Sequence, residues 1–307
     1  MHPKNYRAEY TAELERAAAR TAETPSRGTR ELVSIIRSTS ADVQQRLAAI
    51  REVSAGDPLS KPSVIKALLK IVETDEEPAE VRLAALTTLE QVSVRMAEFR
   101  PYQADFTAAL RKATTSEDSV LRERAMDILA LDKDPFVQEL LEQGLRNPDQ
   151  ASVAPESALR MLGYDAHAGH YDLLQDIVST SDKPKLRQMA LGLLAADSSA
   201  KNTFAKIAAD RTEDSAARST SAVALQALAP KEFSTLARTI VADEDDDDGV
   251  RATVLTALTH DQSEQPTASR RSTQSSMVDV VRTIGTSKAA SAQLKAAARD
   301  YLALHGS

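Results

Sequence analysis

Apolar residues recur along the chain at the spacing of amphipathic helices. One phrase places apolar or small residues at offsets −1, 3, 4 and 7 from a marked position, usually basic, which is one helix face at 3.6 residues per turn. The phrase occurs eight times, at a mean step of about 36 residues. The marked positions are Arg46, Arg82, Arg122, Pro155, Arg187, Arg218, Arg251 and Lys295. This regularity predicts a chain built from one recurring structural unit.

A second amphipathic segment precedes each copy of the phrase, as residues 64–72 precede the copy at Arg82. A short polar link, usually acidic, joins the two segments, for example at residues 74–78 and 116–118. Such links suit helix starts, because Ser, Thr, Asn and Asp accept hydrogen bonds from free N–H groups and carboxylates favour the positive end of the helix dipole. No stretch alternates apolar and polar residues with period two, so no sheet is expected. The predicted unit is helix, turn, helix, in about eight pairs.

Two segments depart from the repeat. Residues 1–28 form a lone amphipathic segment with Tyr6, Tyr10 and Leu14, predicted to be a helix that caps the exposed end of the first repeat. Residues 29–307 are then one continuous repeat domain. Within it, residues 259–276 are predicted to be a long polar loop, which explains the wide last step of the repeat.

Composition narrows the function classes. The 307 residues carry a formal charge of −7 and contain no Cys and no Trp, which excludes disulfides, Cys-bound metals and thiol nucleophiles. The negative charge lies in the repeats, so general nucleic-acid binding is disfavoured. No apolar run approaches the roughly 18 residues of a membrane helix, and no secretory segment opens the chain. We therefore expect a soluble cytoplasmic protein without a cofactor and without membrane insertion.

The repeat resembles that of HEAT-repeat proteins across residues 29–305. The resemblance rests on a Pro or Asp in the turn and on second-helix phrases such as EVRLAALTTL (residues 80–89) and DGVRATVLTAL (residues 248–258). The short period is similar to that of the HEAT-like repeats of the phycobilisome lyase group. The resemblance implies an all-α fold, a right-handed armadillo-like solenoid of about eight helix pairs. Deoxyhypusine hydroxylases of the wider family bind iron through His-Glu pairs, and this chain contains no His-Glu dipeptide.

The resemblance further implies a function in binding other macromolecules, usually on the face lined by the second helices. The expected function is a non-catalytic scaffold or adaptor that binds a protein partner along this concave face. The candidate binding residues are the outward positions Arg51, Thr87, Thr88, Asp127, Arg160 and Thr256. The alternative, an enzyme subunit of the phycobilin-lyase type acting on a tetrapyrrole-bearing protein, rests on repeat similarity alone.

The repeated basic residue has two interpretations. It could form a basic stripe that binds an acidic peptide or phosphates. The favoured interpretation is a structural ladder in which each arginine pairs with a turn carboxylate of its own or the next unit. Asp42, Asp118, Asp214 and Asp247, each four residues before the marked position, are the candidate carboxylates. The ladder residues are Arg46, Arg82, Arg122, Arg187, Arg218 and Arg251.

Two further motifs carry chemistry. Residues 243–248 are six consecutive acids, which could attract a basic partner or a divalent cation but are expected to be a solvated turn. His167 and His170, with Asp165 and Asp172, have the chemistry of zinc ligands, yet their place between repeats favours an ordinary linker. No phosphate-binding loop and no Gly-x-Ser-x-Gly elbow is present, and no residue stands out as a nucleophile.

Overall fold

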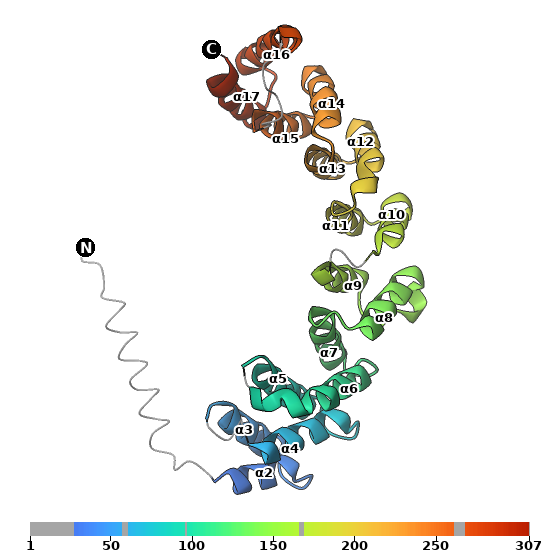
Figure 1. Cartoon of the computed structure of the whole chain (residues 1–307), viewed down its shortest axis with the longest axis vertical. Helices are drawn as coiled ribbons and strands as arrows, with labels where there is room; N and C mark the ends of the chain where they lie inside the picture. The colour runs from blue at the N-terminus through green and yellow to red at the C-terminus, as the bar shows by residue number, and fades with distance from the viewer. Residues whose placement is uncertain (1–27, 57–60, 96, 166–168, 261–267, 307) are drawn as a thin grey trace, which may run out of the picture. The chain divides into compact units, whose positions relative to one another are not determined.

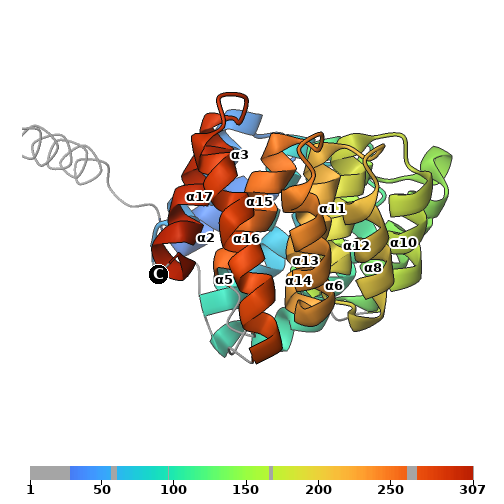
Figure 2. The same ribbon diagram turned by 90° about the horizontal axis from the view of Figure 1, so that it is seen from above.

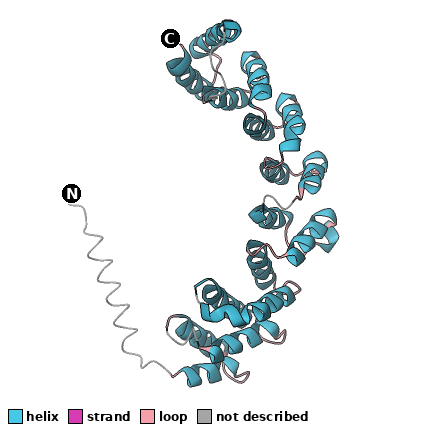
Figure 3. Cartoon of the chain, in the orientation of Figure 1, coloured by secondary structure: helices cyan, strands magenta, loops and turns pink. Residues whose placement is uncertain are grey.

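The computed structural model of the chain describes residues 28–56, 61–95, 97–165, 169–260 and 268–306. These residues form 16 α-helices with short 3₁₀ turns and contain no β-strand (Figure 3). The prediction of an all-α fold is confirmed. The capping helix expected at residues 1–28 lies outside the described residues, apart from Gly28, which precedes the first described helix.

The helices fall into two compact units, residues 1–132 and 133–307. In the first unit, α2 pairs with α3, α4 with α5, and α6 with α7 (Figure 1). The pairs also stack, because α4 packs against both α2 and α6 while α5 packs against both α3 and α7. The helices of this unit are α2 (Thr29–Arg37), α3 (Val43–Ser54), α4 (Pro62–Glu73), α5 (Ala79–Arg95), α6 (Gln103–Ala113) and α7 (Ser119–Leu131).

The second unit repeats the arrangement with five pairs, from α8 with α9 to α16 with α17. The second helices α9, α11, α13, α15 and α17 each pack against the next, and Figure 2 shows several of them side by side. The helices are α8 (Pro135–Arg146), α9 (Pro155–Leu162), α10 (Tyr171–Thr180), α11 (Pro184–Leu194), α12 (Lys201–Ala209), α13 (Ser215–Leu228), α14 (Pro230–Ala242), α15 (Asp248–Thr259), α16 (Ala268–Thr286) and α17 (Ala292–His305).

The residues at the repeat offsets form the core of each unit. In α5, Val81, Ala85, Leu86 and Leu89 have no exposed surface. The matching positions of α11, which are Leu186, Ala190, Leu191 and Leu194, are buried as well. The phase of the apolar stripe read from the sequence is therefore the phase of burial in both units.

The segment 259–276 differs from its prediction as a loop. Thr259 is the last residue of α15, and α16 begins at Ala268, so at least residues 268–276 are helical. The first two turns of α16 are polar in sequence (ASRRSTQSS), so they carry no apolar stripe that would reveal a helix.

None of the helices that the structure describes is long and apolar enough to cross a membrane.

Candidate functional site: the arginine ladder and the acidic turns

Five of the six ladder arginines bind the end of the preceding helix. In each, Nε donates to a carbonyl oxygen in the last turn of the first helix of the same pair. A helix leaves its last carbonyl groups without intrahelical partners and favours a cation there, so a guanidinium satisfies both needs. The N···O distances are 3.0 Å for Arg46 to Ile36, 3.2 Å for Arg82 to Val72, 2.8 Å for Arg187 to Val178, 3.1 Å for Arg218 to Ala208 and 3.3 Å for Arg251 to Val241.

Three of these arginines also reach forward to a carboxylate in the turn of the next pair. The acid lies five residues before the next marked position, so one guanidinium joins the two helices of its own pair to the turn of the next pair. The forward pairs are Arg46 with Glu77 at 2.6 Å, Arg187 with Glu213 at 2.8 and 2.9 Å, and Arg218 with Asp246 at 2.5 and 2.7 Å. The last two are bidentate, which is the strong and directional form of this contact.

The aspartates four residues before the marked positions have a different role from the one predicted. Each is the N-cap of its own second helix and accepts hydrogen bonds from backbone N–H groups of the first turn. Their side chains thus serve the helix start, while the acid at offset −5 serves the ladder. The cap distances are 3.0 Å for Asp42, 2.8 Å for Asp118, 2.9 Å for Asp214 and 2.9 Å for Asp247.

Arg82 and Arg251 pair with a carboxylate of their own repeat instead. Arg82 contacts Asp75 at 3.0 Å, and Arg251 contacts Asp248 at 3.1 Å. For Arg251 the reason is in the sequence, because the forward position is Ala290, which has no carboxylate. Arg122 donates to two carbonyl oxygens of its own turn. The forward position for Arg122 is residue 150, which is a glutamine and not an acid.

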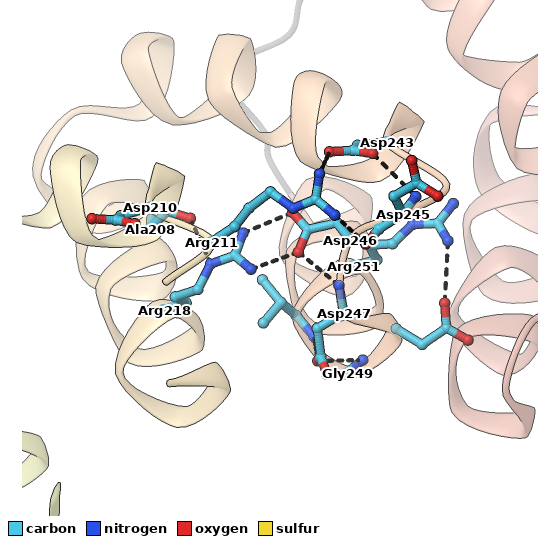
Figure 4. Close-up of polar contacts among 12 residues, drawn as sticks. Ala208, Asp210, Arg211, Arg218, Asp243, Asp245, Asp246, Asp247, Gly249 and Arg251 are labelled. Atoms are coloured by element: carbon cyan, nitrogen blue, oxygen red, sulfur yellow. Dashed lines mark hydrogen bonds and ion pairs between the residues drawn. The ribbon is translucent and has the colours of Figure 1, made fainter. Parts of the chain in front are cut away.

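The six-acid run at residues 243–248 is divided among several structural roles (Figure 4). Asp243 pairs with Arg211 at 3.2 Å, and the buried Asp246 holds Arg218. Asp247 caps α15, and Asp248 binds both Arg251 and the backbone N–H of Ser291, the latter at 2.6 Å. The expected solvated turn is therefore only partly solvated, since Asp246 has 4% of its side chain exposed.

Glu244 and Asp245 are the remaining two acids of the run, and both are exposed. Among the described residues, neither carboxylate has an ion pair or accepts a hydrogen bond, although the backbone oxygen of Asp245 accepts from Arg211. Their carboxylates are therefore available to a ligand.

The environment of Asp246 gives stability a pH dependence. Burial by itself raises the pKa of Asp246, but hydrogen bonds from Arg218 and from the Asp247 N–H, with the charges of Arg218 and Arg211, outweigh burial and lower it. A lowered folded-state pKa stabilises the protein above the unfolded pKa, and this contribution is lost as the pH falls through the folded pKa.

We expect wild type and Asp246→Asn to differ by a constant free energy of unfolding above about pH 5, and the difference to shrink below about pH 4. Urea titrations across this range measure it. A difference that does not change with pH would contradict the assignment of this carboxylate as charged in the folded protein.

The candidate binding residues are not equivalent in the structure. Arg51, Arg160 and Thr256 are exposed on second helices, as expected. Thr87 and Asp127 are partly buried, and Asp127 pairs with Arg124 at 3.3 Å. Thr88 is buried, which differs from its prediction as an outward residue, and its hydroxyl donates to the Ala84 carbonyl oxygen.

Two further exposed residues, which were not among the predicted binding residues, share the helix position of Arg160 and Thr256. Arg160, Gly192, Val223 and Thr256 all lie five residues after the marked position, and all four are exposed. They lie on α9, α11, α13 and α15, each of which packs against the next. We call these four residues the second-helix row. Val223 is a 48% exposed apolar residue, and a Cβ added to Gly192 would meet no atom within 4 Å.

The histidine cluster does not assemble as a metal site in the described residues. His167 lies outside them. His170 Nδ1 is 2.6 Å from Glu142 Oε1, and Asp165 pairs with Lys133 at 3.1 Å. No group of three or more His, Cys, Asp or Glu side chains in the described part of the chain is arranged to hold a metal ion.

The sequence matches no protein-family model and no curated protein.

Proposed function

We propose that the protein is a non-catalytic scaffold built as a HEAT-like α-solenoid, which binds a protein partner along the second-helix face. The observation that carries the proposal is the second-helix row: one exposed residue, at a fixed register, on each of four second helices that pack in succession. Repeat proteins whose units contact only their neighbours present extended surfaces of this kind to their partners.

Chemistry of the row supports a protein ligand. Arg160 and Thr256 supply polar contacts, and the exposed Val223 supplies an apolar one, which is a mixture found in protein interfaces. Gly192 leaves space between them that a partner side chain can fill, because its Cβ position is open. The row carries one positive charge, that of Arg160, and the exposed Asp300 of α17, at the same offset in the next repeat, carries a negative one.

The test is affinity capture from the native extract with a face-blocking variant. Gly192→Arg adds a long side chain in open space on α11, so we expect it to fold as wild type does and to lose the partner that wild type retains at stoichiometric yield. The matched control is Asn202→Arg, which adds the same charge at an exposed position of the first helix α12. Capture that is equal for wild type, Gly192→Arg and Asn202→Arg would contradict binding on this face.

The bilin-lyase alternative predicts a different result. Mixing the purified protein with a bilin would shift the absorption band of the pigment, and the shift would not depend on Gly192.

A further inference from the structure

A groove lies where the arginine ladder ends. It has a volume of about 360 Å³ and lies between the acidic turn after α14 and the last turns of α16. Val280 of α16 and Ala289 line one side together with Ile284, which is only 5% exposed, and Glu244 and Asp245 stand at its acidic rim. We call it the α16 groove.

The arginine ladder is interrupted at this groove. At the two preceding turns of this unit a forward guanidinium binds the turn acid, since Arg187 binds Glu213 and Arg218 binds Asp246. Here Ala290 replaces the forward acid, and Arg251 turns back to Asp248. Asp248 in turn accepts a hydrogen bond from the Ser291 N–H, which ties the two turns together across the groove.

The charged residues that line the groove differ in whether they have an ion-pair partner. Asp248 and Arg251 form an ion pair, whereas the carboxylates of Glu244 and Asp245 have no ion-pair partner among the described residues. The groove is therefore lined by apolar side chains on one side and by two carboxylates without an ion pair at its rim.

We propose that the α16 groove binds an arginine side chain from a basic segment of a partner protein. An arginine matches both parts, because its aliphatic stem covers apolar surface while its charged head stays at the polar edge. A guanidinium also pairs with two carboxylate oxygens at once, which an ammonium cannot do in the same geometry. The proposal rests on the proposed protein-binding function but uses a surface separate from the second-helix row.

The experiment titrates full-length protein with a seven-residue probe, Gly-Ser-Arg-Ser-Arg-Ser-Gly, and follows the methyl signals of Ile284 and Val280 by NMR. Two matched probes separate stem from charge: one has citrulline for arginine, and one has diaminopropionate, a cation with a short stem. We expect the arginine probe to shift both methyl signals, the citrulline probe to bind about fivefold more weakly, and the diaminopropionate probe about tenfold more weakly.

A double variant tests the rim. Glu244→Gln with Asp245→Asn removes the two free charges without touching a ladder contact, and we expect about fivefold weaker binding of the arginine probe at low salt. The control is Glu76→Gln with Glu117→Gln, which removes two exposed acids from a groove of the first unit whose lining contains no Val, Ile or Leu. In this control, the Ile284 methyl signal should shift during the titration as it does in wild type.

Several outcomes overturn the inference. They are methyl signals that do not move, equal binding of the diaminopropionate probe, equal loss in the two double variants, and a concentration-dependent dimer that buries the groove. A captured partner that needs Gly192 but not Glu244 or Asp245 would leave the scaffold function standing and remove the groove proposal. Groove binding without any captured partner would do the reverse.

Discussion

Replacing Arg218 by alanine is expected to lower the free energy of unfolding by about 3–5 kcal/mol. The side chain is buried, donates to the Ala208 carbonyl oxygen at the end of α12 and holds Asp246 in the turn before α15. Its removal leaves a buried carboxylate without its partner, and breaking a buried pair in this way costs more than the pair contributes. Thermal and urea unfolding measure the change.

The control for this loss is Asp245→Asn, one residue before Asp246 in the same acidic run. Asp245 is exposed and holds no ion pair among the described residues, so its replacement should change stability by no more than about 0.5 kcal/mol. A replacement of both partners by apolar residues, Arg218→Met with Asp246→Leu, should recover part of the loss, because no charge is then left buried. Equal loss in Arg218→Ala and Asp245→Asn would show that the buried pair is not what distinguishes the two positions.

The parts of the ladder that could be predicted are those with a local cause. The apolar offsets fix which face of each second helix is buried, and the arginine stands at the edge of that face at a constant position. Its partner could not be chosen from spacing alone, since an aspartate four residues before Arg218 and an acid five residues before Arg251 both lie in turns. The structure decides between them, because Asp214 faces the free N–H groups of its own helix while Asp246 faces the preceding repeat.

A sequence signal for the forward pairs nevertheless exists. Glu77, Glu213 and Asp246 share the offset −5 from the next marked position, and Ala290 lacks it where the groove opens. Glu117 also occupies this offset, yet Arg82 pairs with Asp75, which is also held by Lys112 at 2.9 Å. The offset is thus necessary for a forward pair in this chain and not sufficient.

The errors in the candidate site have physical causes as well. Thr88 follows the partly buried Thr87 in α5, and a rotation of about 100° per residue is enough to place the second of two neighbours on the buried side. Gly192 and Val223 were missed because a glycine and a valine on a helix carry no chemistry by themselves. Their significance comes only from sharing one register on successive second helices.

A truncation in the core tests the repeat nature of the fold itself. Leu191 of α11 and Leu86 of α5 are fully buried, in different units, and replacement of either by alanine should cost about 2–5 kcal/mol. If each pair of helices depends mainly on its neighbours, the loss should also stay local. Hydrogen exchange in Leu191→Ala should then accelerate in α9 to α13 and remain as in wild type in α2 to α7. In Leu86→Ala it should accelerate in α2 to α7 and remain as in wild type in α9 to α13.

The control Leu304→Ala, at a position 62% exposed on α17, should change neither stability nor exchange by a measurable amount. Exchange that accelerates uniformly in both units after either truncation would mean that the chain unfolds as one cooperative body, and that stability here is not a sum of local contributions.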